Sequence, residues 1–551
     1  MHIEKNIVDS ILGTLLDIPG KTKDHAKARY DLKEMGIRKN LHPKDTGDNK
    51  RTKFAKACFS MTNGEKSVFC GVLKTAKLPD GSASNISRCV QLDERKLSGY
   101  KTHDAHFMLH YLLPIPIKSI LPNHLAIPLI RLCSFFQRLC KKVIILEELD
   151  CLEVEIRETI NQLEQIFPPS FFDIMIHLPI HLVNEVRLGG PVQNRWMYST
   201  EREMGTFKSY IRNRRYPEGC IAEARVGIDL SLFPKKGCPL GAKKTDPVSL
   251  DNKSLSQAHE YLLGNCDEIQ EYIREHEQEV NNHPRRSKWS KAKDHCQNFS
   301  QWFEIRALQE DVPDLIKELS RGPNSVAKRY SGYLINGYRF HIRQHDARHK
   351  TQNSGATVVA STTSFASSKD KNPIAADLTY YSRIVDIVEL DYFSHFKAVL
   401  FKCDWYEVEK DIYVLTYVYF NKRCSQEEPF VLASQVHQCF YVQDPYDQDR
   451  HYVMKTVPRD LFNMSDEFES DLPQSYENEF SEHLMGPSIP EDDGEVTLLR
   501  TDVPETVIDF EDESEDESKE ECENGSENEY EDDSEDESDD ESEDEFEDDT
   551  P

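Results

Sequence analysis

A change in hydrophobic period along the chain constrains its fold more than any other feature. Between residues 148 and 167, apolar side chains recur every three or four positions, with acidic residues between them. This spacing places one apolar stripe along a single helix face, and Pro168-Pro169 then ends the helix. The apolar positions are Leu149, Leu152, Ile156, Ile160, Leu163 and Phe167.

Residues 328–464 alternate with a period of two instead. Asn336-Gly337 separates YSGYLI from YRFHI, which is a strong signal for a two-residue hairpin turn. Short segments rich in Val, Ile, Phe and Tyr follow, such as FKAVLFKCDWY and VHQCFYVQD. Strands at this spacing predict a small antiparallel barrel or sandwich, and we favour an SH3-like barrel. The fold class is therefore α+β, with a helical domain before an antiparallel β-barrel-like domain.

The charge is concentrated at the C-terminal end. The net charge is −31, and residues 501–551 hold 29 acids and one lysine, which leaves −3 for the first 500 residues. Such a run cannot bury enough apolar surface to offset chain entropy, so we expect a disordered acidic tail over 465–551. Its serines suit acidophilic kinases, although the tail is a polyanion without phosphate. The candidate phosphorylation sites are Ser514, Ser534, Ser538 and Ser542.

Targeting and metal signals are weak. The first ten residues, MHIEKNIVDS, lack an apolar core behind a basic start, and no apolar run is long enough to predict a membrane span. The 14 cysteines form no CxxC pair and no zinc-like spacing with histidine, so we expect buried, reduced thiols and no metal site. Histidines at 341, 345 and 349 include one on a predicted strand. For those at 103, 106 and 110, helix capping and core packing are as good an explanation as chemistry.

Residues 187–223, RLGGPVQNRWMYSTEREMGTFKSYIRNRRYPEGCIAE, closely resemble a segment of proteins encoded by plant CACTA-type (En/Spm-like) DNA transposons. The opening MHIEKNIVDSILGTLLDIPGKTKDHAKARYDLKEMGIR resembles the end of that family's transposase block. Two later regions resemble its two transposase-associated domains of unknown function. The implied division is 1–40 as a remnant of the catalytic block, 41–98 as a connecting segment, 100–225 as the helical domain, 226–254 as a disordered linker where the resemblance lapses, 255–320 as a helical segment, 321–464 as the β-rich domain and 465–551 as the tail.

The resemblance also implies a reaction and its loss. Catalysis in the family uses an RNase-H-like fold whose three acidic residues hold Mg²⁺ or Mn²⁺ for strand cleavage and transfer. His2 with Glu4 resembles the latter half of an Asp-x-x-His element, which places the first two acids before Met1. The chain is then expected to be truncated and to hold no cofactor. Glu201, in RWMYSTEREM, is the best candidate for a vestigial third acid. Alternatively, Glu201 and Glu203 simply solvate a helix face.

Two basic clusters interleaved with aromatic residues suit contact with phosphates and stacking on bases. The second, HPRRSKWSKAK at 283–293, also suits a nuclear address. A solvated charged face is the alternative explanation for both. The first cluster comprises Lys208, Arg212, Arg214 and Arg215, and the second comprises Arg285, Arg286, Lys288, Lys291 and Lys293 around Trp289.

These observations lead to one expected function and two alternatives. We expect a transposon-derived nuclear protein that binds DNA, including transposon terminal repeats, or partner proteins. Its acidic tail would contact histones or other basic proteins, and it would have neither a membrane nor a small-molecule partner. The alternatives are an inert pseudogene product and a trans-acting part of a composite transposase.

Overall fold

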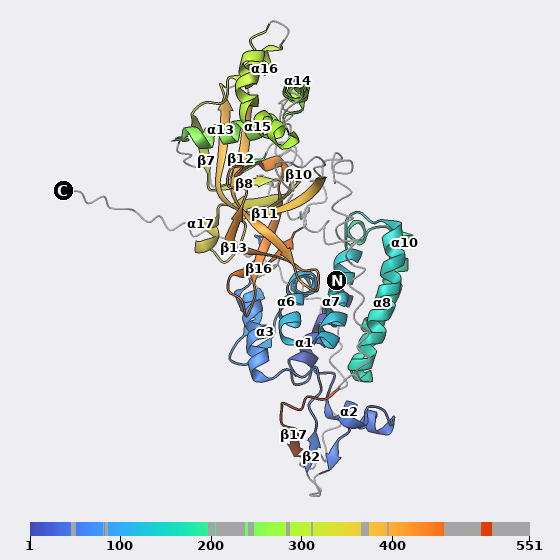
Figure 1. The fold of residues 1–551 in the computed structure, drawn as a ribbon. Helices are drawn as coiled ribbons and strands as arrows, with labels where there is room; N and C mark the ends of the chain where they lie inside the picture. The colour runs from blue at the N-terminus through green and yellow to red at the C-terminus, as the bar shows by residue number, and fades with distance from the viewer. Residues whose placement is uncertain are drawn as a thin grey trace, which may run out of the picture.

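The computed structural model describes residues 1–45, 51–80, 82, 86–196, 204, 237–240, 247–282, 287–309, 312–364, 374–393, 396–456 and 498–509. Helices and a large antiparallel sheet occupy successive parts of the chain, which confirms the α+β class (Figure 1).

The first part of the chain is a helical body with one hydrophobic core. That core runs from Ile7 to Val186 and includes residues of every segment between them, so the stretches before and after residue 100 pack together. Helix α8 contacts both α7 and α10. The principal helices are α1 (His2–Leu15), α2 (Ala26–Glu34), α3 (Asn63–Thr75), α5 (Thr102–Phe107), α6 (Pro114–Ile120), α7 (Asn123–Leu139), α8 (Leu146–Ile166) and α10 (Pro179–Gly189).

Helix α8 is the helix that the apolar stripe predicts. Each of the six predicted apolar positions is buried, including Phe167 at the C-cap. Phe167 stacks between Phe59 and Phe171, with ring centroids 4.9 and 4.3 Å apart. The helix ends before Pro168 because proline lacks the amide hydrogen and crowds the preceding turn.

The β-rich part closes into a ring of six antiparallel strands. The pairings run β11–β12–β13–β16–β15–β10 and return to β11. A closed ring has no free edge, which decides for a barrel over a sandwich, while the SH3-like form stays a prediction. The strands are β10 (Gly355–Ser364), β11 (Ile374–Tyr392), β12 (Phe396–Lys410), β13 (Thr416–Cys424), β15 (His437–Gln443) and β16 (Arg450–Lys455).

Both faces of three barrel strands are buried. On β15, Cys439 and Tyr441 belong to the core inside the ring, whereas Phe440 and Val442 belong to the core of the helical body. Strand β16 repeats this, with Val453 inside and its neighbours on the body, and β13 does so with Val418 inside and Tyr417 on the body. Since successive side chains point to opposite faces, these strands fill the barrel with one set and dock on the helices with the other.

The predicted hairpin is present as β8 (Gly332–Ile335) and β9 (Tyr338–His341). Its turn residues Asn336 and Gly337 have φ angles of 54° and 75°. Asparagine and glycine tolerate these left-handed angles, as a type I′ turn requires.

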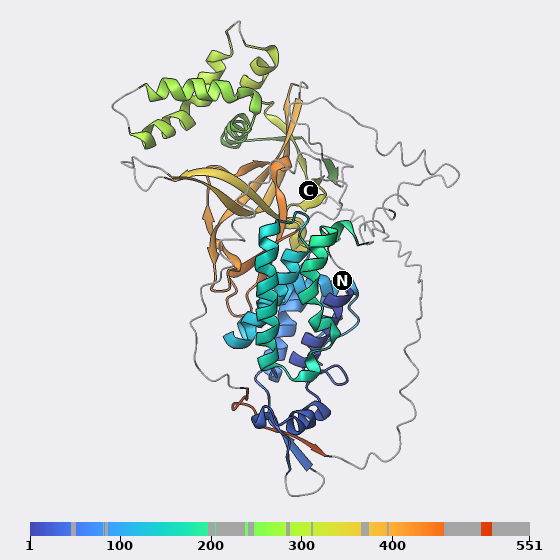
Figure 2. The same cartoon turned by 90° about the vertical axis from the view of Figure 1, so that its right-hand side faces the viewer.

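Helices α13 (Asn252–Gly264), α14 (Gln270–Asn281), α15 (Lys288–Arg306) and α16 (Asp314–Ser320) pack on the far part of the β11–β12 hairpin. The barrel strands therefore lie between these helices and the helical body (Figure 2). His259 on α13 joins the two layers, because its Nδ1 lies 3.0 Å from the Tyr392 hydroxyl.

Two segments expected to be disordered contain strands. Within 226–254, β5 (Cys238–Leu240) pairs with β8, and β6 (Pro247–Ser249) pairs with β7 (Val326–Tyr330). Within 465–551, β17 (Thr506–Asp509) pairs with β2 (Arg51–Phe54) next to α2 (Figure 1). The physical reason is that both segments meet unpaired strand edges, which supply the backbone hydrogen bonds that the segments cannot make alone.

Candidate functional site

Three side chains from distant parts of the helical body converge on one buried point. The Glu4 carboxylate accepts a hydrogen bond from His106 Nδ1 at 2.9 Å and another from His110 Nε2, also at 2.9 Å. The two imidazole rings lie 4.0 Å apart between centroids. Glu4 and His110 are buried, and His106 is partly exposed.

A widened helical turn places the two histidines. Residues Met108–Leu112, labelled η2, form a π turn between α5 and α6, in which the Leu113 amide donates to the Met108 carbonyl at 2.9 Å. Pro114 follows directly and begins α6. Because proline donates no amide hydrogen and its ring crowds the preceding turn, a regular α-helix cannot continue through it. Such π turns occur frequently at functional sites.

Opposing electrostatic effects determine the protonation of this cluster. Burial disfavours a charged Glu4, but the charge of His106 and hydrogen bonds from both histidines outweigh burial and hold the Glu4 pKa well below its usual range. Burial, with a contribution from His106, lowers the pKa of His110 to about 4 despite the Glu4 carboxylate. Near neutral pH the site therefore holds an anionic carboxylate and a neutral His110 that donates through Nε2.

Other groups complete the surroundings of the Glu4 carboxylate. The Cys140 thiol, at the end of α7, lies 3.9 Å from Glu4 Oε1. The Met1 amino group lies 3.3 Å from Oε2. The Trp196 ring meets His106 edge-on at 5.7 Å, and the Gln193 side-chain amide donates to the Cys140 carbonyl at 2.7 Å. Burial and the Glu4 charge raise the pKa of the Cys140 thiol well above its usual range.

The three ligand atoms of Glu4, His106 and His110 lie within 4.8 Å of one another, as the ligands of a metal ion do. Two imidazoles and one carboxylate are also the donor set of many catalytic zinc sites. Sequence reasoning singled out both histidines, whereas it named Glu4 only as part of a family motif and linked it to neither histidine. The adjacent His103 turns away to Asp104, with its Nε2 3.3 Å from a carboxylate oxygen. The helical spacing of the histidines carried a signal, whereas nothing local linked them to Glu4.

Two further histidine groups have different surroundings. The rings of His341, His345 and His349 stack in a column, with centroids 3.9 and 3.7 Å apart. On the helical body, His177 and His181 bring their Nε2 atoms within 3.0 Å at an exposed position. Neither group brings three ligand atoms as close together as the Glu4 cluster does, within the part of the chain that the structure describes.

Only some of the predicted functional residues lie within the residues that the structure describes. His2 is exposed at the start of α1. Lys288, Lys291 and Lys293 lie on the first turns of α15, where Lys293 Nζ is 5.2 Å from the Trp289 ring centre. These assignments stay predictions. The residues outside the described ranges are Glu201, Lys208, Arg212, Arg214, Arg215, Arg285, Arg286, Ser514, Ser534, Ser538 and Ser542.

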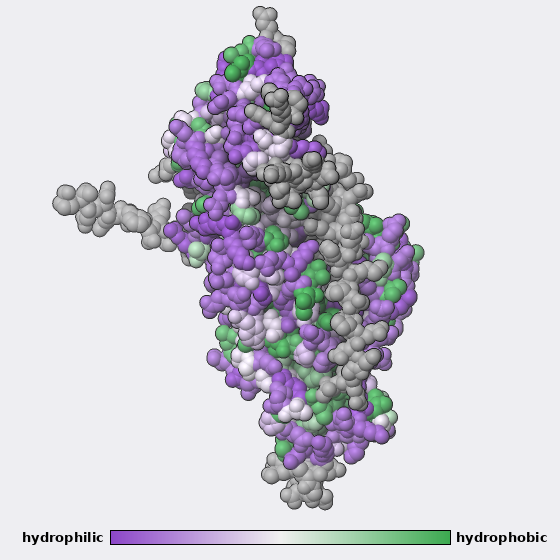
Figure 3. Space-filling model, viewed as in Figure 1, coloured by the Kyte–Doolittle hydropathy of each residue, from purple (hydrophilic) through white to green (hydrophobic). Residues whose placement is uncertain are grey.

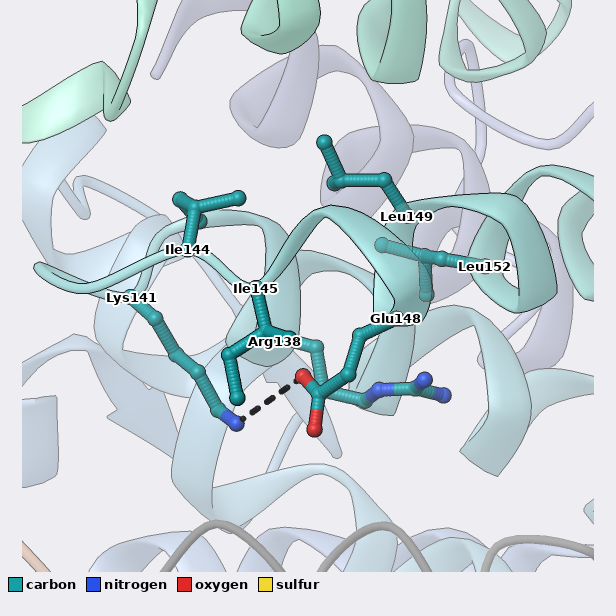
Figure 4. A pocket seen from close by; sticks show the side chains of 7 residues that line it. All are labelled: Arg138, Lys141, Ile144, Ile145, Glu148, Leu149 and Leu152. Carbon is teal, nitrogen blue, oxygen red and sulfur yellow. Dashed lines mark hydrogen bonds and ion pairs between the residues drawn. The ribbon is translucent and has the colours of Figure 1, made fainter. Parts of the chain in front are cut away.

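Helices α7 and α8 enclose a small recess close to Cys140 (Figure 4). Its cavity volume is only about 10 Å³, far below the roughly 300–1,000 Å³ of typical small-molecule sites. Lys141 and Glu148 face each other across it, with their charged atoms 3.4 Å apart (Figure 4). Arg138 in its wall also pairs with Glu155 at 2.6 Å. We interpret this recess as a packing gap between α7 and α8, not as a ligand site.

Two family models match this chain. Residues 139–232 match a domain of unknown function, DUF4218, and residues 388–454 match another, DUF4216. The chain is similar to both. Domains of these two kinds are typical of plant transposase-like proteins. No curated protein and no solved structure matches the chain.

The two matched regions include part of each side of the contact between the helical body and the barrel. The DUF4218 match includes α8, α10 and Cys140, and the DUF4216 match includes the docking strands β13, β15 and most of β16. Glu4, His106 and His110 lie outside both matches.

The visible surface offers no broad apolar area. The face in Figure 3 is mostly hydrophilic, with small, separate hydrophobic areas. Across the described residues, no helix combines the length and the apolar character needed to cross a membrane. Scattered apolar side chains of this kind are normal on folded proteins.

Proposed function

We propose that this chain is a transposon-derived protein of the nucleus that binds DNA or partner proteins and does not itself cut DNA. The observation that carries the proposal is the pair of family matches, in the order helical then β-rich, since both domains are typical of plant transposase-like proteins. The CACTA-type resemblance of residues 187–223 supports the finer assignment.

The packing of the helical body against the barrel favours a rigid binding platform. Phe440 lies against Phe107 at 5.7 Å and Tyr111 at 6.0 Å. Nearby, Lys118 sits 3.6 Å over the Tyr452 ring and pairs with Asp411. Aromatic and cation–π contacts of this kind hold two surfaces in one relative orientation. A fixed orientation suits recognition of an extended partner, such as a DNA duplex, across both parts.

The start of α15 provides a described surface for DNA. Trp289 is 38% exposed, and the Lys293 ammonium lies over its ring. Lys288 is exposed beside it, whereas Lys291 donates to the Asn281 carbonyl at 2.8 Å. Lysines of this kind contact phosphates, and an exposed indole stacks on bases or sugars. The acidic tail complements this surface by suiting histones or other basic partners.

The Glu4 cluster differs from the three-acid site of the resembling family. Strand transfer in the resembling family uses three acidic residues around Mg²⁺ or Mn²⁺. The cluster here combines one carboxylate with two imidazoles, a set that does not suit either hard cation.

A binding and cleavage assay tests the proposal. The full chain is incubated with duplex DNA carrying CACTA-type terminal repeats, over a range of salt concentrations and with Mg²⁺ or Mn²⁺. We expect binding without strand breaks. Replacing Lys288, Lys291 and Lys293 together by alanine is expected to lower the slope of log K against log salt by about 2 to 3, because each phosphate contact contributes about 0.9.

The matched control removes three lysines from elsewhere on the protein. Lys253, Lys328 and Lys397 are exposed and pair with acidic residues. Their triple alanine variant has the same net charge as the α15 variant and is expected to keep most of the salt slope. Equal salt slopes of DNA binding for the two variants would show that the α15 lysines do not contact DNA. Strand cleavage by the chain alone would reject the non-catalytic assignment, and absence of binding at low salt would favour the inert-remnant alternative.

A further inference from the structure

We propose that Glu4, His106 and His110 form a binding site for a zinc-type divalent cation that ties α1 to the α5–η2 turn. The inference goes beyond the proposed function and does not depend on DNA binding. Its basis is the convergence of one carboxylate and two imidazoles, with all three ligand atoms within 4.8 Å of one another.

The geometry needs little change to admit a metal ion. The carboxylate oxygens lie 2.9 Å from the imidazole nitrogens. In a tetrahedral zinc site with bonds of about 2.0 Å, neighbouring ligand atoms lie about 3.3 Å apart. Each oxygen–nitrogen pair would therefore open by roughly 0.4 Å on metal binding, and the three ligand atoms already lie within 4.8 Å of one another. The metal then replaces the two N–H hydrogens, and each displaced proton moves to the other ring nitrogen or to solvent.

The donor set selects the class of ion. Imidazole nitrogens suit Zn²⁺, Co²⁺ and other borderline ions, whereas Mg²⁺ and Ca²⁺ prefer oxygen ligands in larger number. The Cys140 sulfur lies 3.9 Å from Glu4 Oε1 and borders the site, but it is not among the three residues whose ligand atoms lie within 4.8 Å of one another.

The location explains what the ion would do. Glu4 lies on the first turn of α1, the histidines lie on α5 and the π turn, and Cys140 ends α7. One ion at this point links α1 to the α5–η2 turn, whose histidines follow Glu4 by 102 and 106 residues in the chain. Because ligand residues that lie far apart in an unfolded chain form no site, the binding free energy stabilises the folded body.

The test begins with the metal-free full chain. Equilibrium dialysis with Zn²⁺ followed by elemental analysis measures the number of ions bound, and thermal unfolding is recorded with Zn²⁺ or Mg²⁺. We expect about one tightly bound Zn²⁺ per chain and a higher Tm with Zn²⁺ but not with Mg²⁺. Co²⁺ substitution is expected to give the intense visible absorption of a four-coordinate site. Absence of stoichiometric Zn²⁺ binding by the unaltered chain would overturn the proposal without any variant.

Variants then locate the ion. Glu4→Gln and His110→Asn are expected to weaken Zn²⁺ binding by more than the roughly 10- to 100-fold that loss of an outer-sphere partner costs. The control is His181→Asn, which alters an exposed histidine pair with the same four-residue spacing. This control should bind Zn²⁺ as the unaltered chain does. If Glu4→Gln and His110→Asn fold, as judged by circular dichroism, and retain full affinity, the site is elsewhere and the proposal is wrong.

Discussion

Phe440 is expected to be the side chain whose loss most weakens the contact between barrel and helical body. It is 0% exposed and points outward from β15 into the core of the helices, against the rings of Phe107 and Tyr111. Replacing it by alanine removes buried apolar surface and leaves a cavity. Such substitutions cost about 3–5 kcal/mol. We expect the upper half of that range, because a closed ring of strands cannot collapse far into the space.

The measurement is equilibrium unfolding in urea, followed by fluorescence and calorimetry. Phe440→Ala should lower the free energy of unfolding by about 4 kcal/mol and separate the transition of the barrel from that of the body. Phe440→Leu keeps most of the volume and should cost roughly 1–2 kcal/mol. The control is Phe393→Ala, since Phe393 is 54% exposed, and its cost should stay within about 0.5 kcal/mol. A Phe440→Ala value within about 1 kcal/mol of that control would show that the interface contributes little.

Two further predictions concern the pH dependence of stability and the room for a Cβ atom at two glycines. Burial lowers the pKa of His259 to about 4, below the roughly 6.5 of the unfolded chain, so its contribution is complete above pH 6.5 and decreases as the pH falls toward 4. Between pH 7.5 and 5 this loss is about 2 kcal/mol, and His259→Gln should remove that part of the pH dependence of urea unfolding. Gly355→Ala places a Cβ 2.1 Å from the Cys439 carbonyl oxygen and should cost roughly 3 kcal/mol. Gly71→Ala in α3 meets no atom within 4 Å and should raise stability by about 0.5–1 kcal/mol; equal Tm values for the two alanine variants would contradict this.

Several elements were predictable because their signals are local. The stripe ending at Phe167 specifies α8 through a period of three to four residues, and Asn336-Gly337 specifies the hairpin through its tolerance of positive φ angles. Both depend on neighbours in the sequence, so no tertiary contact was needed to find them. The strands within 226–254 and 465–551 were missed for the opposite reason. Each forms only because another strand presents an unpaired edge.

The sequence indicated the two histidines of the candidate site but not their contact with Glu4. His106 and His110 recur at helical spacing in an apolar segment, which marks one helix face but does not separate core packing from ligand binding. Their partner Glu4 lies 102 residues before His106. Its position in the sequence resembles part of a family motif and predicts no contact with either histidine. Only the packing of α1 against α5 brings the three together.

The sequence by itself therefore determined helix α8, the alternating strands of the barrel, the Asn336-Gly337 hairpin and the charge of the tail, because period, turn conformation and charge act over a few residues. Tertiary structure decided where the second apolar face of β15 is buried, and it decided that Glu4 meets His106 and His110. The apolar residues Phe440 and Val442 show that the outer face of β15 is buried, but the sequence does not show which element covers that face. The element that covers that face is selected by the total apolar surface that many distant side chains bury together. These contacts exist only in the folded chain.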